Sequence, residues 1–263
     1  MKDEKKSSNS AIPLVLIVLV FAAVVGGAYY LYQDAKNSSK TGSPTPAPAN
    51  TARQPANAPI GANPPNMLGS PTAAVTIEEF ADFQCGSCGA VHPVMKEIQG
   101  IYGSKIKMIF RNYPLQMHDK AYDAAIVAEA AGIQGRFWQM QDQLFTNQQT
   151  WSLPSSNAKE LWKSYAEKIG LNIQQFENDV AGMAAKSRVD QDLARGKALN
   201  VSSTPTIYIN GEQIPFQMAN VQGLKAIIDQ KLQEAATTQQ SAKPQPAAPA
   251  NSAASSNSNA SSK

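Results

Sequence analysis

The spacing of hydrophobic positions changes several times along the chain and marks where strands give way to helices. Between residues 74 and 83 apolar side chains occupy every second position, as in a strand with one buried face, and Glu79 is the polar exception on that face. Residues 90–98 carry apolar side chains at three- and four-residue spacing, which predicts a helix that ends near Gly100. Residues 105–113 alternate again. A strand–helix–strand unit is therefore predicted.

The next part of the chain has helical spacing almost throughout. Five segments share this pattern, and they cover residues 119–131, 137–145, 157–169, 173–180 and 183–199. Two short apolar runs then flank Asn210 and Gly211, a pair that is typical of a type I′ hairpin turn. Residues 221–233 form a last amphipathic pattern. The predicted order is β-α-β, a block of helices and β-β-α, which is an α/β fold.

Composition separates this part from both ends of the chain. Residues 37–66 consist mostly of Pro, Ala, Asn, Ser and Thr, and residues 236–263 mostly of Ala, Ser, Gln, Asn and Pro. Such segments bury too little apolar surface to offset the entropy of ordering them. We therefore expect a flexible linker over 33–66, one domain over 67–234 and a disordered tail over 235–263. The net charge of +3 is scattered, and no nucleic-acid partner is expected.

Residues 11–32 contain no charged side chain and predict a transmembrane helix. As a helix this run is about 30 Å long, which is enough to cross a bilayer. A cleaved signal peptide is the alternative, but its apolar region would be about 7–15 residues long. Lysines within residues 1–10 favour a cytoplasmic N-terminus. The expected location is the cell (inner) membrane, with a single span and an extracytoplasmic C-terminal domain.

Both cysteines of the chain, Cys85 and Cys88, fall where the first predicted strand turns into a helix. The pair could be half of a metal site, a structural disulfide or a redox pair. Zinc needs a second pair of ligands, and His92 and His118 do not have the spacing for one. A disulfide across two residues constrains the unfolded chain very little. These comparisons favour the redox pair, with no metal.

A redox role assigns different tasks to the two thiols. Only a thiolate attacks a disulfide, and the amides and dipole of a helix N-terminus stabilise an anion. Cys85 is predicted at that N-terminus, exposed on the turn, and is the expected nucleophile. Cys88 lies one turn deeper and is the expected resolving thiol. Glu79, a carboxyl on an apolar strand face, should have a raised pKa suited to proton transfer, unless it simply points to solvent at a sheet edge.

Pro205 follows Ser202, Ser203 and Thr204 directly before a predicted strand. A cis peptide bond in this turn would expose the backbone of Thr204 for pairing with an extended substrate. An ordinary trans turn is the alternative.

Three stretches of the sequence resemble the DsbA-like branch of the thioredoxin superfamily. They are FADFQCGSC, FRNYPLQMHDKAYDAAIVAEAAGIQGRFWQMQDQLF and STPTIYINGEQI. The resemblance implies a thioredoxin fold with a helical insertion over about 115–199 and a cis bond at Pro205. It also implies the roles given to Cys85 and Cys88. Glu79 matches a buried glutamate that moves protons to and from the inner cysteine of the family.

The expected function is that of a membrane-anchored thiol–disulfide oxidoreductase that donates the Cys85–Cys88 disulfide to exported proteins and has no bound cofactor. Its expected partners are exported cysteine-containing proteins and, by resemblance, a membrane redox partner of the DsbB or VKOR kind. Strongly oxidising members usually carry Pro-His between the cysteines, whereas this chain has Gly86 and Ser87. A reductase or isomerase, or a redox-inert peptide-binding module, therefore remains an alternative. His92 is expected to be a helix-surface or packing residue near the site, and His118 to cap the first inserted helix.

Overall fold

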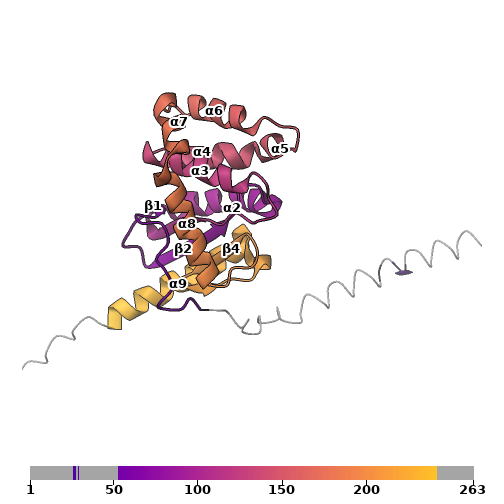
Figure 1. Ribbon diagram of the computed structural model, residues 1–263. Coiled ribbons are helices and arrows are strands. Elements are labelled where there is room, and N and C mark those ends of the chain that lie inside the picture. The colour runs from indigo at the N-terminus through magenta and orange to yellow at the C-terminus, as the bar shows by residue number, and fades with distance from the viewer. Residues whose placement is uncertain (1–25, 28, 30–52, 242–263) are drawn as a thin grey trace, which may run out of the picture. The chain divides into compact units, whose positions relative to one another are not determined.

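The structure is a computed structural model, and it describes residues 26, 27, 29 and 53–241 (Figure 1). The described domain contains a five-stranded sheet in the order β1-β3-β2-β4-β5. The strands are β1 Asn66–Gly69, β2 Val75–Ala81, β3 Ile106–Asn112, β4 Thr206–Ile209 and β5 Glu212–Gln213. β2 and β3 are parallel, and the other pairings are antiparallel. The sequence pattern predicted every strand except β1.

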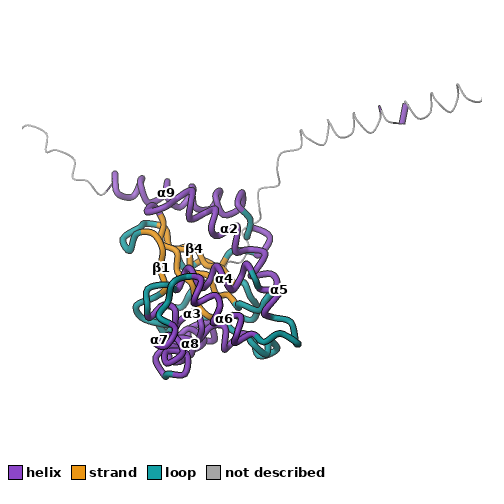
Figure 2. The backbone as a smooth tube through the Cα atoms, turned by 90° about the horizontal axis from the view of Figure 1, so that it is seen from above, coloured by secondary structure: helices purple, strands orange, loops and turns teal. Residues whose placement is uncertain are grey.

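The five helices predicted between the two parts of the sheet are confirmed, and the short α5, which the sequence pattern did not predict, lies among them. The helices of the described domain are α2 Gly86–Tyr102, α3 Ala121–Ile133, α4 Phe137–Thr146, α5 Gln148–Trp151, α6 Ala158–Lys168, α7 Ile173–Ala181, α8 Met183–Ala198 and α9 Val221–Ser241. Asn172 caps α7, where its side chain accepts a hydrogen bond from the Gln175 amide. Both Asn210 and Gly211 have positive φ, as a type I′ turn requires. Figures 1 and 2 place α9 at one end of the domain and α6 and α7 at the other.

The alternation of side chains along β2 divides the core. Val75 and Ile77 pack with Met95 of α2 and Leu224 of α9 on one face of the sheet. Phe80 packs with Tyr113 and Tyr208 on the other face, which α8 covers. Glu79 follows Val75 and Ile77 at two-residue spacing and so lies on the α2 face. Glu78 lies on the α8 face.

The inserted helices enclose a third core that reaches the cysteines. Cys88 and Phe83 belong to the same buried cluster as Phe145 of α4 and Trp151 of α5. The indole rings of Trp151 and Trp162 meet edge to face with centroids 5.5 Å apart. The insertion is therefore packed directly against the strand–helix junction that carries the cysteine pair.

The expected linker over 33–66 is wrong in its last part, because residues 53–66 lie against the domain and β1 begins at Asn66. Arg111 of β3 holds this segment through the carbonyl oxygens of Ile60 and Ala62 at 2.8 and 2.9 Å. Asp192 of α8 accepts a hydrogen bond from the Ala62 amide at 2.8 Å. Ile60 of this segment is exposed and Ala62 is buried, so the segment is ordered mainly by hydrogen bonds between its backbone and buried charges.

The expected tail over 235–263 also begins too early, because α9 continues to Ser241. Ala, Gln and Thr follow residue 234, and the alanines and glutamines among them have high helix propensity. The predicted transmembrane segment over 11–32 lies outside the described residues except for Gly26, Gly27 and Tyr29. Among the residues that the structure describes, no helix has the length and apolar character needed to span a bilayer.

Candidate active site

Cys85 is the N-cap residue of α2, with φ −74° and ψ 121°. Its side chain is 9% exposed, which is less than the sequence led us to expect, because the sulfur lies 3.3 Å from the carbonyl oxygen of Thr204. A hydrogen bond from the Cys88 thiol lowers the pKa of Cys85 to about 5, and Thr204 and the first amides of α2 also contribute against the effect of burial. Cys85 is therefore a thiolate at neutral pH.

Cys88 has the opposite environment. Its side chain is fully buried, and burial raises its pKa far above the ordinary range, with Cys85 and Glu79 adding to the shift. The Asp82 amide donates to the Cys88 sulfur at 3.5 Å. Both thiols are free in this structure. One cysteine of the pair is thus a largely buried anion at the start of α2, and the other is a neutral thiol that solvent does not reach.

The Thr204–Pro205 peptide bond is cis, in agreement with the geometry that the resemblance implies. This turn directly precedes β4 and brings Thr204 against Cys85 across a sequence separation of 119 residues. The Thr204 hydroxyl is buried and lies close enough to the Cys85 sulfur to help lower the pKa of that thiol. Thr204 therefore offers a hydroxyl and a carbonyl to whatever sulfur occupies the position of Cys85.

Glu79 is buried on the central strand of the sheet, and its side chain is 5% exposed. Burial raises the pKa of this carboxyl to about 8. Its charge also affects Cys88, because an ionised Glu79 raises the pKa of that thiol. A carboxyl with this pKa, close to a buried thiol, can both donate and accept a proton near neutral pH.

Asp82, which the sequence did not single out, organises the loop that carries the cysteines. Its fully buried carboxylate accepts hydrogen bonds from the Gln84 amide at 2.7 Å and the Leu115 amide at 2.8 Å. The His118 ring nitrogen Nδ1 lies 2.7 Å from the same carboxylate. The prediction that His118 caps an inserted helix is wrong, because its side chain turns to Asp82 and α3 begins three residues later. His92 is buried and packs on Phe145, as expected.

Gln148 is a second residue that the sequence did not reveal. From the start of α5 its amide nitrogen donates to the carbonyl oxygens of Phe83 at 2.7 Å and Cys85 at 2.9 Å. Gly89 of α2 makes room for it, because a Cβ at Gly89 would lie 2.6 Å from the Gln148 side-chain oxygen. The helical insertion thereby clamps the backbone on both sides of the strand–helix junction.

We expect Gln148→Leu to destabilise the domain by about 1–3 kcal/mol, because the buried carbonyl oxygen of Phe83 loses this donor, whereas that of Cys85 keeps the Gly89 amide. Urea unfolding measures the change. Gln149→Leu, on the exposed neighbour, is the matched control and should change stability by less than about 0.5 kcal/mol. Equal stabilities of the two variants would contradict the clamp.

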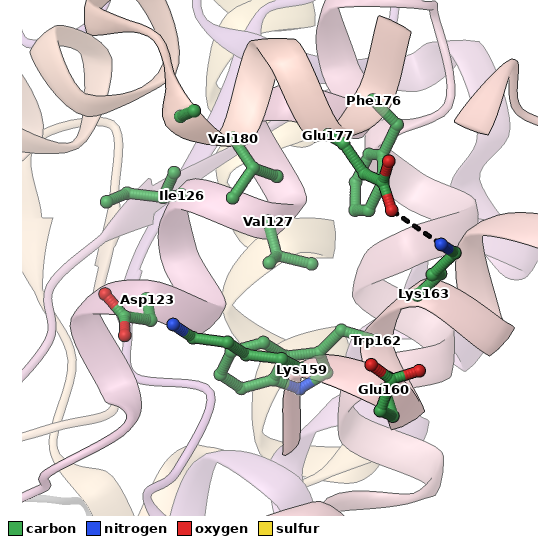
Figure 3. Close-up of a pocket in the computed structure, with 11 residues that line it drawn as sticks. Asp123, Ile126, Val127, Lys159, Glu160, Trp162, Lys163, Phe176, Glu177 and Val180 are labelled. Carbon is green, nitrogen blue, oxygen red and sulfur yellow. Dashed lines mark hydrogen bonds and ion pairs between the residues drawn. The ribbon is translucent and has the colours of Figure 1, made fainter. Parts of the chain in front are cut away.

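A separate cavity of about 440 Å³ lies within the insertion, between α3, α6 and α7. Figure 3 shows apolar side chains such as Val127 and Val180 facing it, with the Lys163–Glu177 ion pair of 2.7 Å at its edge. Neither a cysteine nor a histidine lines it. This cavity is therefore distinct from the cysteine site.

The described residues hold no group of three or more His, Cys, Asp or Glu side chains placed to bind a metal ion. The chemistry that the site can perform is exchange between thiols and disulfides. It has a thiolate to attack or leave, a buried thiol to complete the pair, and a carboxyl to move the proton.

Two curated relatives are sodium/proton antiporters. The chain is 34% identical over 160 residues to Na(+)/H(+) antiporter NhaA 1 of Mycolicibacterium gilvum, a match that covers 59% of this chain and 25% of the antiporter. It is 32% identical over 173 residues to NhaA 3 of Salinispora tropica, covering 65% and 25%. The chain thus spans about a quarter of the length of these relatives. The antiport activity of these relatives is therefore not assigned to this chain.

Solved structures with this fold include BdbD from Bacillus subtilis in its oxidised form. That structure has 25% identity and a TM-score of 0.54, and the match covers 67% of this chain and 98% of BdbD. Wolbachia pipientis alpha-DsbA1 gives a TM-score of 0.59 at 18% identity, covering 67% and 95%. At 18% identity, the likeness to alpha-DsbA1 concerns the fold alone.

A family model described as thioredoxin matches residues 62–230, from the end of the N-terminal segment to α9. This match includes both cysteines, the helical insertion and the cis-proline turn. Since it covers more than half of the chain, the protein belongs to the thioredoxin family.

Proposed function

We propose that the protein is a thiol–disulfide oxidoreductase that donates the Cys85–Cys88 disulfide to exported proteins. The observation that carries this proposal is the contrast within the pair, where the pKa of Cys85 is lowered to about 5 and that of Cys88 is raised. A structural disulfide needs no such contrast. The likeness to BdbD, at 25% identity, supports the same class of chemistry.

Two exchange steps complete the reaction. A substrate thiolate attacks the Cys85 sulfur, the Cys85–Cys88 bond breaks, and Cys88 leaves and takes a proton from Glu79. A second substrate thiolate then attacks the substrate sulfur of the mixed disulfide and releases Cys85 as a thiolate. Two electrons pass from the substrate thiols to the cysteine pair. One proton ends on Cys88, and the other goes to solvent.

The stabilised Cys85 thiolate favours this direction. A low pKa stabilises the dithiol form and so makes the disulfide a stronger oxidant. Gly86 and Ser87 provide no charge for this, and the Cys88 thiol, Thr204 and the helix amides do so instead. A reductase or isomerase is the second candidate function. It is favoured if transfer of the Cys85–Cys88 disulfide to substrate thiols is thermodynamically uphill.

The Thr204 backbone beside the cis-Pro205 bond supports a substrate-binding role. An extended substrate segment that pairs with Thr204 would place its own cysteine at the Cys85 sulfur. The proposed setting is outside the membrane, with residues 11–32 as the anchor. Re-oxidation by a membrane partner of the DsbB or VKOR kind would complete the cycle, and no bound cofactor is needed.

Replacing the resolving thiol tests the proposed function. We expect Cys88→Ala to accumulate mixed disulfides with substrates that contain a disulfide, because the Cys85 thiolate attacks that bond, one substrate sulfur leaves as a thiolate, and nothing intramolecular can release the adduct. Non-reducing gels and mass spectrometry of the adducts measure this. The double variant Cys85→Ala/Cys88→Ala is the control and should form none. A redox-inert peptide-binding module would bind unfolded substrates equally in both variants without a covalent adduct, and that result would overturn the proposal.

A further inference from the structure

A second pocket, of about 450 Å³, lies between α2, α4 and the sheet. Its apolar walls come from Leu68, Met95, Met108 and Trp138. Pockets of about 300–1,000 Å³ with mostly apolar walls and a few polar groups are typical of small-molecule sites. Methionine side chains are flexible and adapt to irregular ligand shapes. The pocket therefore has the volume and the walls of a site for a small organic molecule.

Buried polar side chains in this lining have no hydrogen-bond partner in the described part of the chain. Glu79 of β2 and Gln141 of α4 are 5% and 7% exposed, and neither side chain has a hydrogen bond within residues 53–241. The side-chain oxygen of Gln99 of α2 is buried and also lacks one there. Buried polar groups are nearly always satisfied. Because carboxylate and amide oxygens accept hydrogen bonds, a ligand that donates several of them fits this set.

The charges around the pocket leave the carboxyl of Glu79 uncompensated. Asp142 has its cation, because the Lys96 amine lies 2.6 Å from its carboxylate, and the His92 ring nitrogen Nε2 lies 2.9 Å from the same oxygen. Glu78, the neighbour of Glu79 on β2, is paired with two arginines on the opposite face of the sheet. Glu79 itself has no ion pair within residues 53–241, and burial is what shifts its pKa. The partner that this carboxyl lacks is a cation.

We propose that this pocket binds a small organic ammonium ion, with the ammonium on the Glu79 carboxylate and the hydrocarbon part against the methionines and Trp138. An ammonium group carries three N–H donors, which match the unpartnered oxygens of the lining. The face of an indole ring also attracts a cation. A metal ion fits less well, because it needs several oxygen, nitrogen or sulfur ligands. The described residues hold no group of three or more His, Cys, Asp or Glu side chains that could supply them.

The pH dependence of binding identifies Glu79 as the partner of the ammonium. The ligand binds the ionised carboxylate, whereas burial raises the pKa of Glu79 to about 8 in the empty pocket. Binding therefore releases a proton at neutral pH, and the affinity should rise about fivefold between pH 7 and pH 8. Above pH 8 the affinity should level off, because the carboxyl is then already ionised.

The other ionisable groups that face the pocket or Glu79 keep their charge in this interval. Burial raises the pKa of Cys88 far above the ordinary range, so this thiol stays neutral. Burial lowers the pKa of His92 below 6.5, so its ring is neutral as well. Burial alone would raise the pKa of Asp142, but Lys96 and His92 hold it below its usual value. A change in affinity between pH 7 and pH 8 is therefore assigned to Glu79.

The test is isothermal titration calorimetry of the full chain with butylammonium, whose alkyl amine stays charged at both pH values. We expect a dissociation constant of about 1 mM or below at pH 8. 1-Butanol has the same hydrocarbon part without the charge and should bind at least about tenfold more weakly. Equal affinities for the two compounds, or no binding of butylammonium, would overturn the ammonium site.

Two variants assign the binding to this pocket. Glu79→Gln should weaken the binding of butylammonium at pH 8 by at least about tenfold and abolish its pH dependence, because the charge is lost. Gln141→Leu removes an acceptor and should weaken binding by about fivefold. Glu97→Gln, on an exposed carboxylate of α2 outside the pocket, is the control and should bind as the wild type does.

Melting temperatures establish that the variants fold, and Glu79→Gln alone decides the test if Gln141→Leu does not. An unchanged affinity in a folded pocket variant contradicts the assignment, as does a wild-type affinity that is the same at pH 7 and pH 8. Binding does not require exchange at the cysteine pair. A failure of this proposal therefore leaves the proposed function untouched, and the reverse also holds.

Discussion

We expect the Cys85–Cys88 couple to have a reduction potential of about −180 mV at pH 7. The physical reason is the Cys85 thiolate, whose pKa of about 5 stabilises the dithiol form. Thioredoxin combines a nucleophile pKa of about 7 with about −270 mV, and DsbA combines about 3.5 with about −120 mV. Interpolation between these two proteins gives the expected value. Equilibration with glutathione buffers, followed by alkylation of free thiols, measures it.

The pH dependence of this potential provides an independent control. Above pH 5 the dithiol form holds one proton, on Cys88, so the potential should fall by about 30 mV per pH unit. Below pH 5 Cys85 is protonated as well, and the slope should double to about 59 mV. Thr204→Val should lower the potential relative to Thr204→Ser, which keeps the hydroxyl. A steep slope up to pH 8 with a potential near about −270 mV would indicate an ordinary thiol and a reductase.

The fold was predictable where its signals are local. Alternation placed β2 and β3, the helical period placed the insertion, and Asn210 with Gly211 placed the hairpin. Each of these patterns reflects neighbouring residues along one element. β1 was missed because four residues, Asn66–Gly69, are too few to show a period. Its pairing with β3 depends on a strand that lies about 40 residues away in sequence.

The ordered segment over 53–66 shows a different limit of sequence reasoning. Composition correctly indicated that this segment has little to bury. It could not show that Arg111 and Asp192, which come from β3 and α8, would bind its backbone. An ordered segment that buries only small apolar side chains such as Ala62 is recognised only once the tertiary structure brings these charges together.

The residues of the candidate site also fall into those that the sequence reveals and those that it does not. The spacing of Cys85 and Cys88 and the position of Glu79 on an apolar face could be recognised from the chain alone. Gln148 and Asp82 could not, because their roles arise from contacts across 65 and 36 residues. A buried glutamine or aspartate has no sequence signature that separates it from an exposed one.

We expect Glu79→Gln to stabilise the disulfide form at alkaline pH while it slows exchange. The pKa of Glu79 is raised by burial from 4.5 to about 8, so the folded protein binds this proton more tightly than the unfolded chain. Its stabilising effect is complete below about pH 4.5 and is lost as the pH rises through about 8. The loss amounts to at most about 5 kcal/mol, which glutamine avoids because it does not ionise.

Urea unfolding of the oxidised protein at pH 6 and pH 9 measures this, since Cys88 does not titrate in the disulfide. The wild type should lose stability between the two values, and Glu79→Gln should lose much less. Glu78→Gln is the matched control on the opposite face. Burial alone would raise the pKa of Glu78, but Arg195 and Arg111 hold it below its usual value. Its removal should therefore destabilise the protein at both pH values, by about 3–5 kcal/mol, because two arginines lose their carboxylate.

The same Glu79→Gln variant should slow the step in which Cys88 gains or loses its proton by about 10²-fold. A single residue would then cost stability at alkaline pH and supply the proton that the buried thiol needs. Single-turnover oxidation of a dithiol peptide measures the rate. If stability improves at pH 9 and the rate is unchanged, Glu79 is a buried carboxyl without a part in exchange. If neither changes, Glu79 does not titrate in this range, and the environment assigned to it is wrong.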